Sequence, residues 1–355
     1  MSVVVETHKL TRVFRTYKKK EGFSGSLSGL FKRSYIEKKA AYDLDISIQE
    51  GEVVAFLGPN GAGKTTTLKM LSGLLHPSSG DAHILGYQPW KREHTFLKQI
   101  ALVMGQRNQL WWDLPAIESF NLQREIYEVP SQIYRQRLAE LIEILDLSKI
   151  INTAVRKLSL GERMKCEMVA ALLHRPKVLL LDEPTIGLDV VMQKKIRSFI
   201  KDYNREHGAT IMLTSHYMDD VAALAQRTLV INHGRLVYEG SLETLTERYA
   251  PNKVLRVTFA RPIASVDLAA LGTVVENQNG LARIQVLRDN VAERAAALFQ
   301  KFPVADLSIE EPQLDDIIHD LFLETNQQEE KAIQLELPNL AEPTEETERE
   351  VVAVR

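Results

Sequence analysis

Cysteine is nearly absent from the sequence, and this excludes several kinds of site. A single cysteine, Cys166, stands among 355 residues, so neither an intrachain disulfide nor a cysteine metal cluster can form. One unpaired cysteine is compatible with the reducing cytosol. The opening stretch, MSVVVETHKLTR, also lacks the charged, apolar and small-residue regions of a signal peptide.

Long apolar runs and an excess of one charge are missing as well. No apolar run reaches about 18 residues, so no membrane-spanning helix is predicted, and any membrane contact must use a partner or the protein surface. The net charge of -3 gives no general indication of nucleic-acid binding. The composition, 45% hydrophobic and 26% charged, is ordinary for a globular protein, and the length suggests two domains or one large domain with additions.

Short apolar runs alternate with helical patterns over most of the chain. KVLLLD (177–182) and ATIMLTS (209–215) are continuously apolar, as expected for parallel strands buried on both faces. Residues from about 110 to 175 are mostly helical in pattern, which predicts a helical subdomain between strands. The alternation predicts a layered α/β domain over residues 1–249.

Three other segments depart from this pattern. Residues 17–40 form a basic insertion with glycine and serine in its middle, which either contacts anionic lipid headgroups or a partner, or is a solvated loop. Residues 250–325 contain short strand patterns and one helical pattern, which predict a small C-terminal α+β domain. Residues 326–355 are rich in glutamate and broken by proline, so this acidic tail is expected to be disordered.

A glycine-rich loop carries the strongest chemical signal. GPNGAGKT (58–65) matches G-x-x-x-x-G-K-[ST], follows the apolar strand VVAFL and precedes a helical run, which is the context that the motif requires. Glycines let backbone N–H groups curl around phosphate oxygens, and the helix N-terminus adds partial positive charge. Lys64 is expected to reach the β- and γ-phosphates, and Thr65 to ligate Mg²⁺. The predicted nucleotide-binding residues of the loop are Gly58, Pro59, Asn60, Gly61, Ala62, Gly63, Lys64, Thr65 and Thr66.

An acidic pair ends the apolar run KVLLLDEP. Asp182 stands at the carboxyl end of the predicted strand, where α/β folds place ligand sites, and is expected to hold Mg²⁺ through water. Glu183 follows it and is expected to polarise an attacking water, as phosphoanhydride hydrolysis requires. An acidic pair after a strand can equally be a helix N-cap, but the phosphate loop favours the catalytic interpretation.

Further segments stand in a recognisable order around these two motifs: RKLSLGERMKCE (156–167), TIGLD (185–189) and TSHYMDD (214–220). With them, the sequence resembles the ATP-binding cassette (ABC) ATPases over roughly residues 3–249. The resemblance implies a P-loop NTPase fold with a RecA-like core, an antiparallel β subdomain and an inserted helical subdomain. It also implies an ATPase with ATP and magnesium as cofactors.

The resemblance assigns one group of residues to a facing cassette. Ser159 and Gly161 would contact the γ-phosphate of ATP held by the other protomer, and Asp189 would contact that protomer. The usual signature is LSGGQ, whereas this chain has LSLGE, with Leu160 and Glu162 at the changed positions. Since the serine and the second glycine are retained, ATP sandwiching between two cassettes is expected.

The resemblance also implies roles within one cassette. Gln106 would lie near Mg²⁺ and the attacking water, as a metal ligand and part of the catalytic set. His216 would hydrogen-bond the γ-phosphate and help to orient Glu183. Phe14 is the aromatic residue expected to stack on adenine; Tyr17 is the alternative, and Phe14 could instead be a core residue.

The sequence also resembles the export branch of this family, whose members have separate type 2 permeases. QRNQLWWDLPAIESF and LDEPTIGLDVV resemble the daunorubicin-like or viologen exporters of bacteria. The predicted function is therefore an ATP-hydrolysing exporter subunit that pairs with itself or a paralogue and drives integral membrane permeases exporting a drug, lipid or polysaccharide. It would lie at the cytoplasmic face of the plasma (inner) membrane, held by the permease, with no nucleic-acid partner.

Two other functions fit the same cassette, and one pair of aromatic residues has two interpretations. An importer ATPase has the same cassette, and a non-transport ABC ATPase would act on DNA or ribosomes. Trp111 and Trp112 follow Gln106 in the segment that lines the permease-docking groove in the family, and either anchor a permease or belong to the core between subdomains.

Overall fold

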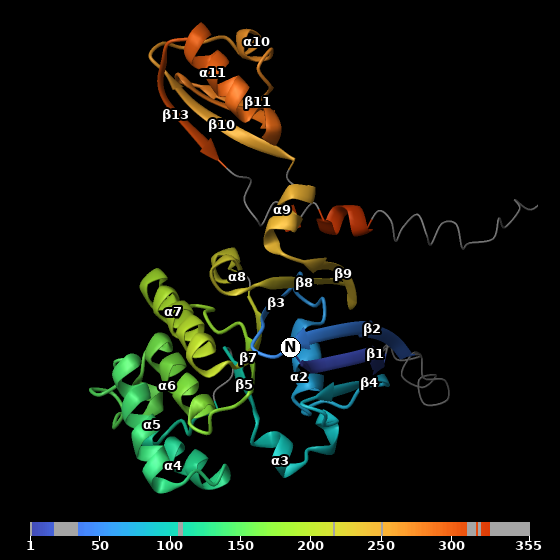
Figure 1. Ribbon diagram of the computed structural model, residues 1–355, viewed down its shortest axis with the longest axis vertical. Helices are drawn as coiled ribbons and strands as arrows, with labels where there is room; N and C mark the ends of the chain where they lie inside the picture. The colour runs from blue at the N-terminus through green and yellow to red at the C-terminus, as the bar shows by residue number, and fades with distance from the viewer. Residues whose placement is uncertain are drawn as a thin grey trace, which may run out of the picture. The chain divides into compact units, whose positions relative to one another are not determined.

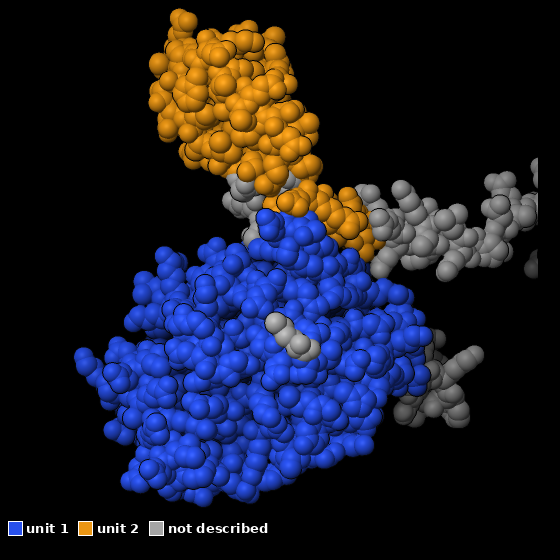
Figure 2. All heavy atoms as spheres, in the orientation of Figure 1, with its two compact units in different colours: residues 1–244 blue, residues 245–355 orange. Residues whose placement is uncertain are grey.

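The computed structural model describes most of the chain: residues 2–17, 35–105, 109–215, 217–249, 251–310, 317–318 and 321–326. It divides the chain into two compact units, Met1–Thr244 and Leu245–Arg355 (Figure 2). Most of the predicted basic insertion, nearly all of the predicted acidic tail, and both Gln106 and His216 lie outside the described residues. In the part of the chain that is described, no helix has the length and apolar character that a membrane crossing needs.

A six-stranded sheet forms the centre of the first unit (Figure 1). Its strand order is β5-β6-β7-β3-β8-β9, and all neighbours are parallel except β8 and β9. The two apolar runs predicted as buried parallel strands are β6 and β7, so that prediction is confirmed. The strands are β3 (Val53–Leu57), β5 (Ile100–Met104), β6 (Val178–Asp182), β7 (Thr210–Thr214), β8 (Arg227–Asn232) and β9 (Arg235–Gly240).

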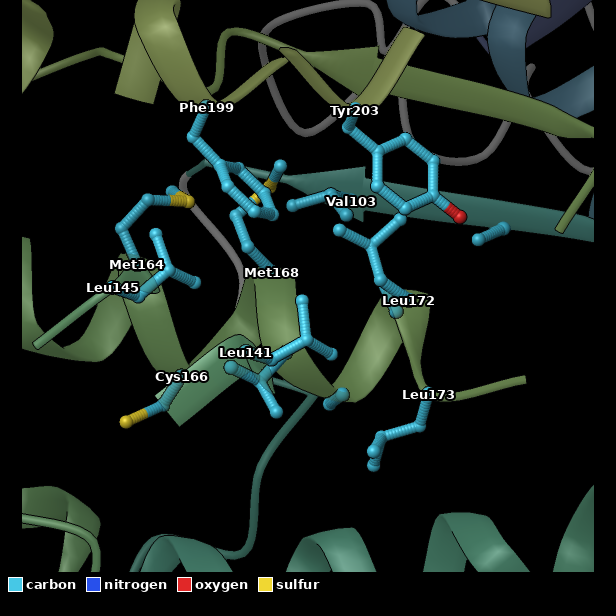
Figure 3. Close-up of a cluster of buried hydrophobic side chains, with 14 of the residues drawn as sticks. Val103, Leu141, Leu145, Met164, Cys166, Met168, Leu172, Leu173, Phe199 and Tyr203 are labelled. Atoms are coloured by element: carbon cyan, nitrogen blue, oxygen red, sulfur yellow. The ribbon is translucent and has the colours of Figure 1, made fainter. Parts of the chain in front are cut away.

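Burial on both faces explains why these strands are apolar at every position. Successive side chains of a strand point to opposite faces. Leu179 and Leu181 pack into one hydrophobic core with the helices, whereas Val178 and Leu180 pack into a second core on the other face. Figure 3 shows part of the first core, where side chains such as Met168 lie beneath Phe199.

Side chains of the helices make up much of that first core. Three of them fall within the stretch predicted to be helical and gather at one end of the unit in Figure 1. They are α4 (Ala116–Ile126), α5 (Ser131–Ile144) and α6 (Leu160–Leu172). The other helices of this unit are α2 (Lys64–Leu71), α3 (His94–Leu97), α7 (Val190–His207) and α8 (Met218–Leu224), with 3-10 turns at Pro89–Lys91 and Val155–Lys157.

A second, antiparallel sheet with the order β2-β1-β4 lies beside the phosphate loop. Its strands are β1 (Val3–Tyr17), β2 (Tyr35–Gln49) and β4 (Ser79–Ile84). Residues 35–40, the end of the predicted insertion, therefore belong to β2. In the register of β1 and β2, Phe14 stands opposite Lys38. This register brings both residues to one wall of the site described below.

The second unit has its own antiparallel sheet, with the order β11-β12-β10-β13. In β10, buried Leu255, Val257 and Phe259 alternate with exposed Arg256 and Thr258, as in a sheet covered on one face. The elements are β10 (Asn252–Phe259), α10 (Ser265–Leu268), β11 (Thr273–Gln278), β12 (Leu281–Leu287), a 3-10 turn at Arg288–Asn290, α11 (Val291–Lys301) and β13 (Val304–Glu310). Helix α9 (Leu242–Tyr249) spans the boundary between the units.

Candidate nucleotide-binding and catalytic site

The phosphate loop runs from the end of β3 to the start of α2, as the motif predicts. Gly63 occupies the N-cap of α2 with φ 112°, a conformation that favours glycine. A Cβ atom at this position would lie 1.8 Å from the carbonyl oxygen of Ala40 in β2, so only glycine fits between the loop and that strand. The N–H groups of the loop and of the first turn of α2 can therefore face an anion.

Lys64 places its ammonium group inside the loop. The side chain is 6% exposed, and Nζ donates hydrogen bonds to the carbonyl oxygens of Gly58 at 2.6 Å and Pro59 at 3.2 Å. Burial lowers the pKa of Lys64, and the nearby carboxylates of Glu183 and Asp182 oppose part of this shift. The two acids thus favour the charged form, which is the form that binds phosphate.

Three oxygen-bearing side chains meet at the carboxyl end of β6. The Thr65 hydroxyl donates to Asp182 Oδ2 at 2.9 Å, and the Thr214 hydroxyl donates to Asp182 Oδ1 at 2.8 Å. Hydroxyl and carboxylate oxygens are the ligands that Mg²⁺ prefers in proteins. The donor set therefore fits the cation that the sequence assigns to Thr65 and Asp182.

Glu183 has an unusual backbone conformation. Its φ is 56°, in the left-handed region that side chains other than glycine rarely adopt, and its N–H donates to both the carbonyl and the hydroxyl oxygen of Thr214, at 3.1 and 3.0 Å. Such a conformation costs about 1–3 kcal/mol and persists where the surroundings fix it, often at functional sites. No pattern in the sequence indicates it.

A cavity of about 230 Å³ joins these groups to the sheet of β1 and β2. Phe14 lies in its wall, 37% exposed, with the Arg12 guanidinium 4.8 Å from the ring centroid. The structure thus brings Phe14 to the same cavity as the phosphate loop and Glu183. The full lining is Phe14, Lys38, Ala40, Asn60, Gly61, Gly63, Lys64, Thr65, Thr66 and Glu183.

Lys38 is a site residue that the sequence analysis missed. Its ammonium lies 3.6 Å from the point where a Cβ of Gly61 would be, and the side chain is exposed. In the sequence, Lys38 falls within the basic insertion, some twenty residues before the phosphate loop. The pairing of Phe14 with Lys38 across β1 and β2 is a signal that could have located it.

The residues predicted to contact a facing cassette stand at helix N-termini. Ser159 caps α6, where its hydroxyl accepts from the Glu162 N–H at 3.3 Å while the Glu162 carboxylate accepts from the Ser159 N–H at 2.8 Å. Asp189 caps α7 by accepting from the Met192 N–H at 2.9 Å. Glu162, which departs from the usual signature, thus completes a capping box.

The other signature residues pack against the first turn of α7 and against the loop before it. Gly161 faces the Met192 side chain: a Cβ on this glycine would lie 3.0 Å from Met192 Cγ. Leu160 Cδ2 would lie 2.8 Å from a Cβ on Gly187. Ser159, Gly161 and Asp189 are not among the described residues that line the cavity. Their predicted roles, and those of Gln106 and His216, stay predictions.

Comparisons with known proteins place the chain in a family. The family model for the ABC transporter covers residues 41–186, and that for the C-terminal domain of EvrA-like ABC transporters covers residues 251–310. NatA, an ABC transporter ATP-binding protein of Bacillus subtilis, is 35% identical over 209 residues, which are 59% of this chain and 85% of NatA. The chain belongs to the ABC transporter family. As an ATP-binding subunit of that family it is an ATPase.

Two further relatives differ in length from this chain. BcrA of Bacillus licheniformis, a bacitracin transport ATP-binding protein, is 32% identical over 216 residues, which are 61% of this chain and 69% of BcrA. YbhF of Escherichia coli, a probable multidrug ABC transporter ATP-binding protein, is 35% identical over 231 residues. That match covers 65% of this chain and 39% of YbhF, so this chain spans well under half of the longer relative.

Among solved structures, the fold resembles a dimeric ATP-binding cassette in a post-hydrolysis state with ADP and Pi. The TM-score is 0.56 at 24% identity, over 67% of this chain and 98% of the other. This likeness confirms the predicted P-loop cassette fold.

Proposed function

We propose that this chain is the ATP-hydrolysing subunit of an exporter and drives separate membrane permeases. The observation that carries the proposal is the single cavity in which an aromatic ring, the phosphate loop and Glu183 meet. The relatives support a transport role, because BcrA is named for bacitracin transport and YbhF is named as a probable multidrug ABC transporter ATP-binding protein. Neither relative is named for import, DNA or ribosomes, so the alternatives gain no support.

In this proposal, each group of the cavity acts on one part of ATP. Phe14 stacks on adenine, and Lys64 with the loop N–H groups binds the β- and γ-phosphates. Thr65 and Asp182, with Gln106 as a further predicted ligand, would hold Mg²⁺, which neutralises phosphate charge when bound. Glu183 accepts a proton from the attacking water, which is general base catalysis.

The site needs a second cassette in this proposal. Ser159, Gly161 and Asp189 stand at helix ends outside the cavity, which supports a role toward a facing protomer, where an N-terminal N–H group and a serine hydroxyl suit a γ-phosphate. His216 would add its hydrogen bond from within the same chain. Binding of two ATP molecules closes the pair, and hydrolysis reopens it.

A permease holds the pair at the cytoplasmic face of the plasma (inner) membrane in this proposal. Trp111 and Trp112 are 48% and 46% exposed, which favours an interface over a core position. The Arg163 guanidinium lies 5.6 Å from the Trp112 ring centroid. Large half-exposed aromatic side chains are favoured anchors at interfaces.

Co-purification in a mild detergent tests the transport proposal. The full chain carrying Glu183→Gln, with Mg-ATP, is expected to retain polytopic membrane proteins without a solute-binding protein. Adding Trp111→Ala and Trp112→Ala to this chain is expected to abolish the co-purification. The same two changes in the wild-type chain should leave ATP turnover without permease at the wild-type rate. Recovery of ribosomes or DNA-bound proteins instead would contradict the transport proposal and leave only the ATPase.

Lys38 gives a smaller prediction for nucleotide affinity. Lys38→Ala is expected to weaken ATP binding roughly 1.5- to fivefold, with less effect at high salt, because an exposed cation beside Gly61 contributes about 0.2–1 kcal/mol. Lys39→Ala is the matched control, since the Lys39 ammonium lies over the Tyr42 ring, 3.8 Å from its centroid. Calorimetric titration with ATP measures both; equal affinities of the two variants would remove Lys38 from the site.

A further inference from the structure

Asp220 in α8 has a fully buried carboxylate that joins two loops of the first unit. The residue is 0% exposed. Its Oδ2 accepts hydrogen bonds from the Thr185 hydroxyl and, at 2.7 Å, from the Ser215 hydroxyl. Thr185 lies two residues after Glu183, and Ser215 directly follows β7. One carboxylate oxygen thus connects the loop after β6 to the loop after β7.

A buried arginine balances the charge of this carboxylate. Arg197 in α7 is 7% exposed, and its Nη1 lies 3.4 Å from Asp220 Oδ1. Among the described residues, Oδ1 has no hydrogen bond of good geometry, so the ion pair with Arg197 is what compensates it. A buried charge is tolerated only when paired, which makes the two residues mutually dependent. The pair therefore ties α7 to α8 as well as joining the loops.

The loop held in this way is the one that carries Glu183. The left-handed backbone of Glu183 is fixed on one side by its bonds to Thr214. On the other side, Thr185 is held by Asp220, and the same loop ends at Asp189, the N-cap of α7. The loop is thus held at its start by β7 and at Thr185 by Asp220. It ends at α7, the helix that contains Arg197.

We propose that Asp220 is a positioning residue for hydrolysis. With Arg197, it fixes the loop from Glu183 to Asp189 relative to the loop after β7, so that Glu183 is held in one orientation toward the reacting water. The inference rests on the catalytic role proposed above for Glu183. Thr185 and Asp220 do not line the cavity, so the affinity for ATP should not depend on the contacts of Asp220. The rate of hydrolysis should depend on them.

The kinetic test uses Thr185, because Asp220→Asn leaves Arg197 buried without a counter-charge and weakens the fold itself. In the full chain, Thr185→Val keeps the volume and removes the hydroxyl. It is expected to lower kcat for ATP about tenfold or more with KM within about twofold, and Thr185→Ser is expected to restore kcat. Asp219→Asn is the matched control: Asp219 lies 3.6 Å from Arg197 but its side chain is 88% exposed, so kcat should not change.

The inference would be overturned if Thr185→Val had the kcat of the wild type. It would also be overturned if Thr185→Ser lost as much kcat as Thr185→Val.

A second readout needs no ATP. In hydrogen exchange of the nucleotide-free chain, Thr185→Val is expected to raise deuterium uptake both in residues 184–189 and in residues 217–219 beyond β7. A rise confined to 184–189 would show that the loops are not coupled and would overturn the inference. A wild-type chain without ATP turnover would contradict the proposed function, and the exchange result would still decide the coupling.

Discussion

Glu183→Gln is expected to lower the rate of ATP hydrolysis by about 10²- to 10⁴-fold, the usual contribution of a general base. The change keeps the size of the side chain but removes the group that accepts the proton from water. Affinity for ATP should stay within about threefold of wild type, because the loop and Lys64 supply the phosphate contacts. Phosphate release gives the rate, and equilibrium binding of ATP gives the affinity.

Glu243→Gln, an exposed position in α9, is the control for a charge-neutralising change away from the site. It should hydrolyse ATP at the wild-type rate. If Glu183→Gln turned over ATP at more than about a third of that rate, Glu183 would not be the base. A joint loss of rate and of ATP affinity would mean that Glu183 acts in binding.

Lys64→Ala is expected to weaken ATP binding by about 30-fold or more. The Lys64 ammonium is buried against the carbonyl oxygens of the loop, and truncating one partner of a buried charge-assisted contact costs about 2–5 kcal/mol. The same change removes the cation that faces Asp182 and Glu183, so phosphate would enter beside two uncompensated carboxylates. Calorimetric titration with ATP, at matched ionic strength, measures the loss.

Lys201→Ala, an exposed lysine of α7, controls for the loss of one positive charge. It should bind ATP as the wild type does. A thermal melt of Lys64→Ala checks that the chain is folded, since the lysine lies in a packed loop. An ATP affinity equal to that of the wild type in the folded variant would contradict the phosphate-loop assignment.

The elements of the fold that could be predicted are those with local signals. Strand β6 is apolar at every buried position because its two faces enter different cores, and the phosphate loop is recognisable because its glycines, strand and helix are contiguous. The capping of α6 by Ser159 likewise follows from a serine three residues before a glutamate. Each of these signals lies within about ten residues.

The features that could not be predicted depend on contacts between distant segments. Lys38 reaches the cavity because β2 pairs with β1 and lies against Gly63 at Ala40, and nothing near Lys38 in the sequence indicates that contact. The Arg197–Asp220 pair joins two helices, and an arginine in an amphipathic helix ordinarily faces water. The left-handed backbone of Glu183 is likewise a product of its tertiary surroundings.

Whether two cassettes hold ATP between them is decided by the mass of the Glu183→Gln chain in solution. Light scattering during gel filtration should give the mass of one 40.2 kDa chain without nucleotide and the mass of two chains with Mg-ATP. Adding Lys64→Ala should return it to one chain, because closure requires bound ATP. A chain that binds Mg-ATP and keeps the mass of one copy at every concentration would contradict a self-paired cassette.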